Sequence, residues 1–157
     1  MNQNPQHKTE RPSATDVVNG WFAACSRGDL DRAIALLDQK VIWHVDGEPS
    51  VTTTGLLCGP EQVRAWLIRF PQHFTPRKFA IDRLIEHGGS VLALGHFRHT
   101  VLSTGNTVGS DMIIHFSIAN GKITRYQIFE DSALLRRAFD ADDDWQQQQI
   151  RINGTLY

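Results

Sequence analysis

Four side chains in this sequence have the chemistry that proton transfer needs. Asp131 ends an apolar, strand-like run. A carboxyl group beside an apolar pocket has a raised pKa, which suits a general acid or base near neutral pH. His44 lies in the run 41–45, and a histidine can carry protons near pH 7 without tuning. His96 and Arg98 are two residues apart in another such run, so they share one face. Together these residues predict acid–base chemistry, with Arg98 as an electrostatic partner.

Each assignment has an alternative in the same residues. Asp131 directly precedes Ser132, so it could instead cap a following helix. A buried Arg98 needs a carboxylate partner. Pairing with Asp131 would lower the pKa of that acid, whereas a surface ion pair is worth about 1 kcal/mol at most. Glu130 would point inward if the strand were shifted by one residue, because such a slip moves every side chain to the other face.

Aromatic side chains are the candidates for lining a pocket. They are Trp43, Trp66, Phe70, Phe97, Phe129 and His115, with Glu130 beside them. Core packing is the alternative for most of them, since aromatic residues dominate ordinary cores. A pocket this apolar would favour hydrophobic or polyketide-like small molecules.

Seven histidines raise the question of a metal site. His96 and His99 are three residues apart in a strand-like run, so they point to opposite faces. His44, His96 and His115 would have to converge from three strands, and no His-Glu-x-x-His or comparable spacing occurs. The sequence also has no Walker loop, dinucleotide-binding glycine motif or serine nucleophile elbow. It therefore predicts no metal and no cofactor.

The first half of the chain has the periodicity of helices. Ser13 and Asp16 resemble a capping box before a first helix, which Gly28 ends. Asp29 caps a second helix, whose apolar residues repeat at helical spacing over 30–37. A strand follows at 41–45, and residues 48–58 form a loop or a short edge strand. A third helix begins at Gly59-Pro60 and is closed by Pro71.

The second half has the pattern of a strand meander. Strands are predicted at about 78–87, 90–102, 107–119 and 122–131. Gly88-Gly89, Thr104-Gly105-Asn106 and Asn120-Gly121 divide them, and Asn-Gly is the strongest of these hairpin signals. Ser132 is expected to cap a last short helix. The order is helix, helix, strand, helix, then four strands, which predicts an α+β fold. In it a cone-shaped, curved antiparallel sheet packs on three helices around an internal pocket.

Length and charge limit the remaining choices. At 157 residues the chain fits one domain over 13–140, with a flexible arm at 1–12 and a polar tail at 141–157. A net charge of −1 gives no reason to expect nucleic acid or an anionic membrane as a partner. No apolar stretch resembles a signal peptide or a membrane span, which predicts a cytoplasmic protein. Cys25 and Cys58 are expected to be reduced thiols.

The chain resembles the SnoaL-like and ketosteroid-isomerase-like members of the nuclear transport factor 2-like superfamily. The resemblance covers about residues 14–139. It is carried by Gly28-Asp29-Leu30, Val41-Ile42-Trp43-His44, Gly59-Pro60-Glu61-Gln62-Val63, Asn120-Gly121-Lys122-Ile123 and Phe129-Glu130-Asp131-Ser132-Ala133. The order and spacing of these motifs are specific for the fold rather than for a function.

The resemblance implies several roles. Asp131 falls where several family enzymes carry an acid, and His44 falls where ketosteroid isomerase has its proton-shuttling carboxylate. The oxyanion-hole residues of that enzyme have no clear match. His96 and Arg98 fall near the Arg and Asp that flank the pocket of limonene-epoxide-hydrolase-like enzymes. The implied function is a cofactor-free isomerase, cyclase or epoxide-hydrolase-like enzyme acting on a hydrophobic small molecule.

The alternative is a non-catalytic module of the same fold that binds a ligand or a protein. An open cavity would favour the small-molecule function, and a pocket filled by its own side chains would favour the interaction module. The family also implies a homodimer through the outer face of the sheet. Apolar residues on both faces of 112–118 agree with that, since one face would otherwise be wet.

Overall fold

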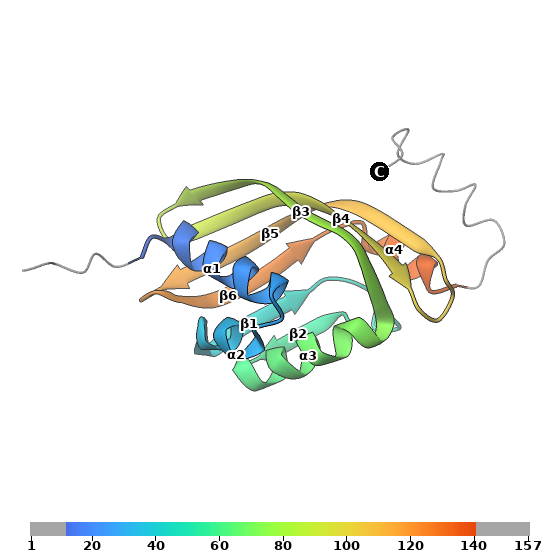
Figure 1. Ribbon diagram of the computed structural model, residues 1–157, viewed down its shortest axis with the longest axis horizontal. Helices are drawn as coiled ribbons and strands as arrows, with labels where there is room; N and C mark the ends of the chain where they lie inside the picture. The colour runs from blue at the N-terminus through green and yellow to red at the C-terminus, as the bar shows by residue number, and fades with distance from the viewer. Residues whose placement is uncertain (1–11, 141–157) are drawn as a thin grey trace, which may run out of the picture.

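A six-stranded curved sheet that does not close into a barrel dominates the computed structural model, which describes residues 12–140. The arm and tail predicted at the two ends lie almost wholly outside the described residues. The elements are α1 (Ala14–Ser26), α2 (Leu30–Ala35), β1 (Leu37–Val45), β2 (Gly55–Cys58), α3 (Pro60–His73), β3 (Phe74–His87), β4 (Ser90–Val101), β5 (Thr107–Ala119), β6 (Lys122–Phe129) and α4 (Ser132–Ala138). The α+β cone predicted from the sequence is confirmed, and β2 is the short edge strand (Figure 1).

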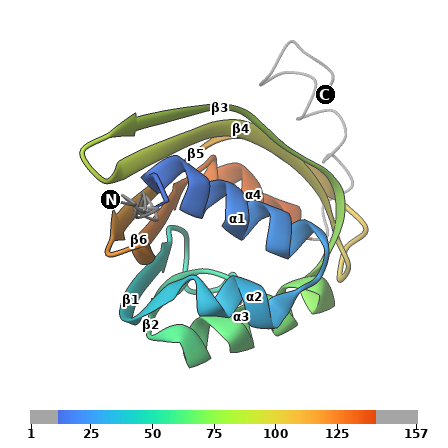
Figure 2. The same ribbon diagram turned by 60° about the vertical axis from the view of Figure 1, so that its left-hand side comes forward.

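The strands lie in the order β2-β1-β6-β5-β4-β3. All neighbouring pairs are antiparallel except β1 and β6, which run parallel. Strands β3, β4 and β5 arch over α1, while α2 and α3 lie across the opposite side (Figure 2). The concave face of the sheet and these helices therefore enclose the interior. Within residues 12–140, no helix is both long and apolar enough to cross a membrane.

The helix ends largely follow the local signals. Ser13 and Asp16 form the predicted capping box, and the Asp29 carboxylate accepts a hydrogen bond from the Arg32 N–H. The second helix is shorter than predicted, because Leu37 is already the first residue of β1. The third helix continues past Pro71 to His73. Pro71 lies in the last turn, where it removes a single donor without blocking the residues that follow.

Tight turns set the register of the meander. Asn120 and Gly121 both have positive φ, of 53° and 72°, as a two-residue hairpin turn requires. Strand β3 begins at Phe74, four residues earlier than predicted, and contains Pro76. A proline is tolerated there because β3 is an edge strand of the sheet.

The sheet bends sharply where β3 crosses β4. The register between them shifts between Ile81 and Arg83. At this point Gly95 of β4 comes so close to β3 that a Cβ atom on it would lie 2.1 Å from the Ala80 carbonyl oxygen. A side chain at Gly95 would therefore force the two strands apart. The bend draws β3 over the interior of the cone (Figure 2).

A second irregularity decides which side chains of β6 face inward. The pairing of β5 with β6 shifts between Ser117 and Ile118. Ile123 is buried, but further along the strand the buried positions are Tyr126 and Ile128. The inward parity therefore changes after Ile123, and alternation from Ile128 brings Glu130 to the inner face.

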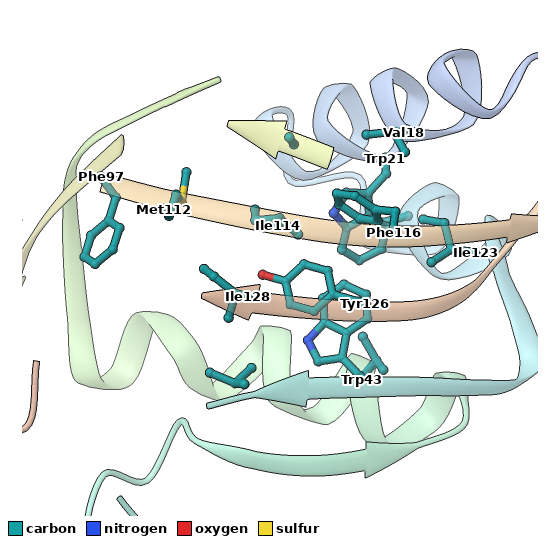
Figure 3. Packing of buried hydrophobic residues seen from close by; sticks show 14 of the residues in the cluster. Val18, Trp21, Trp43, Phe97, Met112, Ile114, Phe116, Ile123, Tyr126 and Ile128 are labelled. Carbon is teal, nitrogen blue, oxygen red and sulfur yellow. The ribbon is translucent and has the colours of Figure 1, made fainter. Parts of the chain in front are cut away.

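Stacked and tilted aromatic rings fill one end of the interior, which we call the packed end and define by Trp21, Trp43, Phe116 and Tyr126. The Trp43 and Tyr126 rings stack with centroids 3.7 Å apart and an interplanar angle of 2°. Trp21 lies 5.0 Å from Trp43, and Phe116 lies 5.4 Å from Tyr126. Phe97, Met112 and Ile128 lie toward the other end of the same face (Figure 3).

Candidate functional site

A cavity of about 740 Å³ occupies the other end of the concave face, which we call the cavity end. Its wall comes from α1, α3, α4, the strands β1 and β3 to β6, and the connection between β1 and β2. Six aromatic rings dominate it: Phe22, Trp66, Phe70, Phe74, Phe79 and Phe97. The volume lies in the range that holds a small organic molecule. No Lys or Arg is among the described residues that line it.

Glu130 is the carboxyl group in the wall of this cavity. It follows β6 at the position that the shifted parity turns inward, and it is half-buried. Burial raises the pKa of the Glu130 carboxyl to about 7, and the carboxylates of Asp131 and Asp46 add to the rise. Near neutral pH this group can therefore both donate and accept a proton.

Asp46 is held close to Glu130 by partners on the outer side of the sheet. His44 Nε2 lies 2.9 Å from Asp46 Oδ1, and Gln127 Nε2 donates to Asp46 Oδ2 at 3.2 Å. Arg125 in turn donates to the Gln127 Oε1 atom at 3.0 Å. His44 therefore contacts Asp46 and does not line the cavity.

Asp131 is the N-cap of α4. Its Oδ1 atom accepts the Leu134 N–H at 2.8 Å, and its own N–H donates to Ser110 Oγ at 3.0 Å. Asp131 rather than Ser132 caps the helix, so the cap predicted at Ser132 is wrong and the alternative predicted at Asp131 is confirmed. The carboxylate is exposed and does not line the cavity, but it lies near enough to Glu130 to raise the pKa of that neighbour.

His96, Arg98, His115 and Phe129 lie on the outer face of the sheet. The buried residues of β4 and β5 alternate with them, and none of the four lines the cavity. His96 Nδ1 lies 3.0 Å from Asp82 Oδ2, and His115 Nε2 lies 2.6 Å from Ser90 Oγ. Phe129 is 47% exposed. Their roles in the site, like those of His44 and Asp131, remain predictions.

The other lining residues predicted from the sequence divide between the two ends. Trp66, Phe70 and Phe97 line the cavity. Trp43 belongs to the packed end and is 1% exposed. In residues 12–140 no group of three or more His, Cys, Asp or Glu side chains is arranged to hold a metal ion.

His99 also lines the cavity, although no role in the site was predicted for it. It is two residues from Phe97 on β4, so both side chains face the cavity. Burial lowers the pKa of the His99 imidazole to about 4, against a smaller opposing effect of the Arg98 carbonyl. The ring is therefore neutral at pH 7. The signal in the sequence was its spacing from Phe97, which predicts a shared face.

Cys25 also lines the cavity, and the residue as a whole is exposed. Burial of the sulfur raises its pKa to about 12. The thiolate is the nucleophilic form of cysteine, so Cys25 is not activated at neutral pH. Glu130 is therefore the group in this wall that is poised for proton transfer.

A cone of this topology is the architecture of the nuclear transport factor 2-like proteins. The family model for the SnoaL-like domain matches residues 18–126. The chain therefore belongs to the SnoaL-like domain family, as the resemblance in the sequence indicated. No curated protein matches it.

Solved structures show the same fold. An NTF2-like protein of unknown function from Burkholderia pseudomallei is 26% identical, with 82% of this chain and 98% of that one covered at a TM-score of 0.74. TerC, crystallised with polyporic acid, is 20% identical, with 80% and 97% covered at a TM-score of 0.72. A protein from Pseudomonas putida named as a candidate polyketide cyclase is 22% identical, with 75% and 91% covered at a TM-score of 0.64.

Proposed function

We propose that this protein is a small-molecule enzyme in which Glu130 moves a proton on a hydrophobic substrate held in the cavity. The observation that carries the proposal is the inward carboxyl group of Glu130, with a pKa raised to about 7, in a wall built mainly of aromatic and aliphatic side chains. A general acid or base works best when its pKa lies near the working pH. This proposal moves the acid–base role from Asp131 to its neighbour.

The carboxylate form of Glu130 would remove a proton from a carbon next to a carbonyl group. The C–H bond breaks, its electron pair moves toward the carbonyl oxygen, and Glu130 becomes a carboxylic acid. An isomerase returns the proton to another carbon of the same molecule. In a cyclase the enolate carbon attacks a second carbonyl group, and Glu130 returns its proton to the alkoxide that forms. Both reactions need one proton carrier in the cavity.

Activation of water between two acids is supported less well. Among the described residues, Glu130 is the one carboxyl group in the cavity wall. His96 and Arg98, which the resemblance places beside an epoxide-hydrolase site, lie on the outer face. The name of the Pseudomonas putida relative and the ligand crystallised with TerC support, by analogy, a small organic substrate.

The exchange of carbon-bound hydrogen tests the proposal without knowledge of the natural substrate. 2-Tetralone, a two-ring ketone, would be incubated with the protein in D₂O, and loss of its α-hydrogen signal would be followed by NMR. We expect wild-type protein to accelerate exchange and Glu130→Gln to lose about 10²–10⁴-fold of that rate.

Asp131→Asn is the matched comparison, because the two residues are neighbours and each change replaces a carboxyl group with an amide. We expect it to lose less than tenfold. A large loss in Asp131→Asn with none in Glu130→Gln would return the role to Asp131. If 2-tetralone binds wild-type protein but no exchange occurs, the cavity is a ligand-binding site without catalysis.

The homodimer predicted from the family stays a prediction. Exposed apolar side chains do gather on the outer face: Ile113 pairs with Phe129 across β5 and β6, and Ile85 pairs with Leu92 across β3 and β4. They are 42%, 47%, 44% and 37% exposed, respectively. A face of this kind is where a second copy would bind.

A further inference from the structure

His99 places a polar side chain in the aromatic part of the cavity wall. Its side chain lines the cavity, and the residue is 8% exposed. Nδ1 is enclosed and has no hydrogen-bond partner among the described residues. Because Nδ1 is enclosed, a ligand would have to approach the other ring nitrogen, Nε2. A hydrogen bond between Nε2 and a ligand oxygen, made in a site shielded from water, would stabilise the complex.

Three phenylalanine rings fix the orientation of this imidazole. The Phe97 ring stacks on it with centroids 4.7 Å apart and an interplanar angle of 24°. Phe70 meets it edge to face at 5.4 Å, and Phe74 lies at 5.7 Å. A ring held on several sides loses little further freedom when it binds a ligand, which favours directional hydrogen bonding.

Glu130 and His99 lie at separate places along the wall. Phe129 pairs with Ile113 of β5, so Glu130 comes level with Met112, which pairs with Gly95 of β4. His99 is four residues beyond Gly95, and at the rise of a strand this separates the two positions by roughly 13 Å along β4. The two groups cannot act on one atom. They can contact opposite ends of one molecule.

We propose that His99 is a substrate-binding residue that hydrogen-bonds a hydroxyl or carbonyl oxygen at the end of a multi-ring aromatic ligand remote from Glu130. This inference rests on the proposed function, because it places the reacting end of the ligand at Glu130. Aromatic rings between the two polar points match the ligand class. An anionic group is excluded at the His99 end, because the wall supplies no Lys or Arg to balance it.

The test compares ligands that differ only in their oxygen atoms. 2,6-Dihydroxynaphthalene, 2-naphthol and naphthalene carry two, one and no hydroxyl groups, and 2-naphthoic acid adds an anion. Their affinities would be measured by titration of the folded protein. We expect wild-type protein to bind the dihydroxy compound about tenfold more tightly than 2-naphthol, which corresponds to about 1.4 kcal/mol. 2-Naphthoic acid should bind more weakly than 2-naphthol.

His99→Phe keeps the ring and removes its nitrogens. We expect this variant to fold, to keep its affinity for 2-naphthol and to lose the tenfold preference. His99→Gln restores a polar group and should recover part of that preference. The same His-to-Phe change at His87, which is exposed at the end of β3, is the control and should alter nothing.

Nitrogen-15 NMR of the histidine rings gives a readout that a purely structural role would not move. The His99 signals, assigned by their absence in His99→Phe, should shift with 2,6-dihydroxynaphthalene and stay in place with naphthalene. An unchanged tenfold preference in His99→Phe would overturn the inference, as would a failure of wild-type protein to bind any of the compounds.

The two proposals fail in different ways. If Glu130→Gln keeps full 2-tetralone exchange while His99→Phe loses the ligand preference, the proposed acid is wrong and the His99 contact stands. If Glu130→Gln loses exchange while His99→Phe keeps the preference, the proposed function stands and the His99 contact is refuted.

Discussion

The packed end and the cavity end of the concave face are built from the same kinds of residue, yet only one of them is filled. At the packed end, Trp21, Trp43, Phe116 and Tyr126 are each at most 6% exposed and contact one another. At the cavity end the aromatic rings surround a space of about 740 Å³. Trp43 and Trp66, with centroids 6.2 Å apart, mark the boundary.

The difference shows that aromatic content alone does not indicate a binding site. At the packed end, Trp21 of α1 reaches the rings of the sheet and fills the interior. At the cavity end, Glu130 and His99 add ionisable groups that a filled core would exclude. Stability should therefore depend mainly on the packed end, and pH dependence and ligand binding on the cavity end.

The largest expected effect is at the packed end. Trp43→Ala removes a side chain that contacts Trp21, Trp66 and Tyr126, and we expect it to cost about 3–5 kcal/mol of unfolding free energy. Phe70→Ala at the cavity end should cost only about 1–2 kcal/mol, because part of that ring already faces open space. Urea unfolding at pH 7 measures both. Equal losses would remove the energetic distinction between the two ends.

The next effect concerns how stability changes with pH at the cavity end. The pKa of Glu130 is about 7 in the folded protein and ordinarily 4.5, so the folded state binds more protons between these values. The contribution of Glu130 to the free energy of unfolding therefore falls as the pH rises from 4.5 to about 7. His99 has the opposite effect on the pH dependence of stability. Its pKa is about 4 when folded and ordinarily 6.5, so the unfolded state binds more protons there and stability rises with pH.

The two contributions oppose each other between about pH 4.5 and 6.5. Relative to wild type, we expect Glu130→Gln to gain stability as pH rises, by up to about 3 kcal/mol at pH 8. His99→Phe should gain as pH falls, by up to a similar amount at pH 4. Urea unfolding of the three proteins at pH 4, 6 and 8 measures these differences. If the differences in unfolding free energy between these proteins were the same at all three pH values, burial would not shift the pKa of either group.

The smallest effect separates Asp131 from its neighbour. Asp131→Ala removes the N-cap of α4 and should cost about 1 kcal/mol. Ser132→Ala, the cap expected from sequence, should change stability by less than half a kcal/mol, since Ser132 is inside the helix. Thermal unfolding of the two variants decides between them. A larger loss in Ser132→Ala would contradict the observed cap.

Much of the fold could be predicted, because its signals are local. Each of these signals involves residues that are close together in the chain. A helix begins after the Ser13–Asp16 capping box and another after Asp29, and a hairpin turns at Asn120-Gly121. The order of these signals along the chain was also enough for the family. The boundary of α2 at Leu37 was missed, because a leucine at helical spacing fits either the helix or the strand that follows it.

The site could be predicted only in part, because its acid depends on a non-local irregularity. Counting in twos from Ile123 gives 125, 127, 129 and 131 as inward positions, which selects Asp131. The shift in pairing between β5 and β6 moves the inward positions to Tyr126, Ile128 and Glu130. No residue pattern within β6 alone predicts that shift in pairing. The same limit applies to His99, whose neutral state depends on burial by α3 and β3 residues far away in the chain.

The close approach of Gly95 to Ala80 means that a change between β4 and β3 can alter the shape of the cavity. Any side chain at Gly95 must displace β3, and β3 carries Phe79 and Ile81 of the cavity wall. A substitution at a residue that does not itself line the wall would thus change the space available to a ligand. Descendants of this chain, natural or designed, can in this way change the size of molecule they accept while every lining side chain keeps its identity.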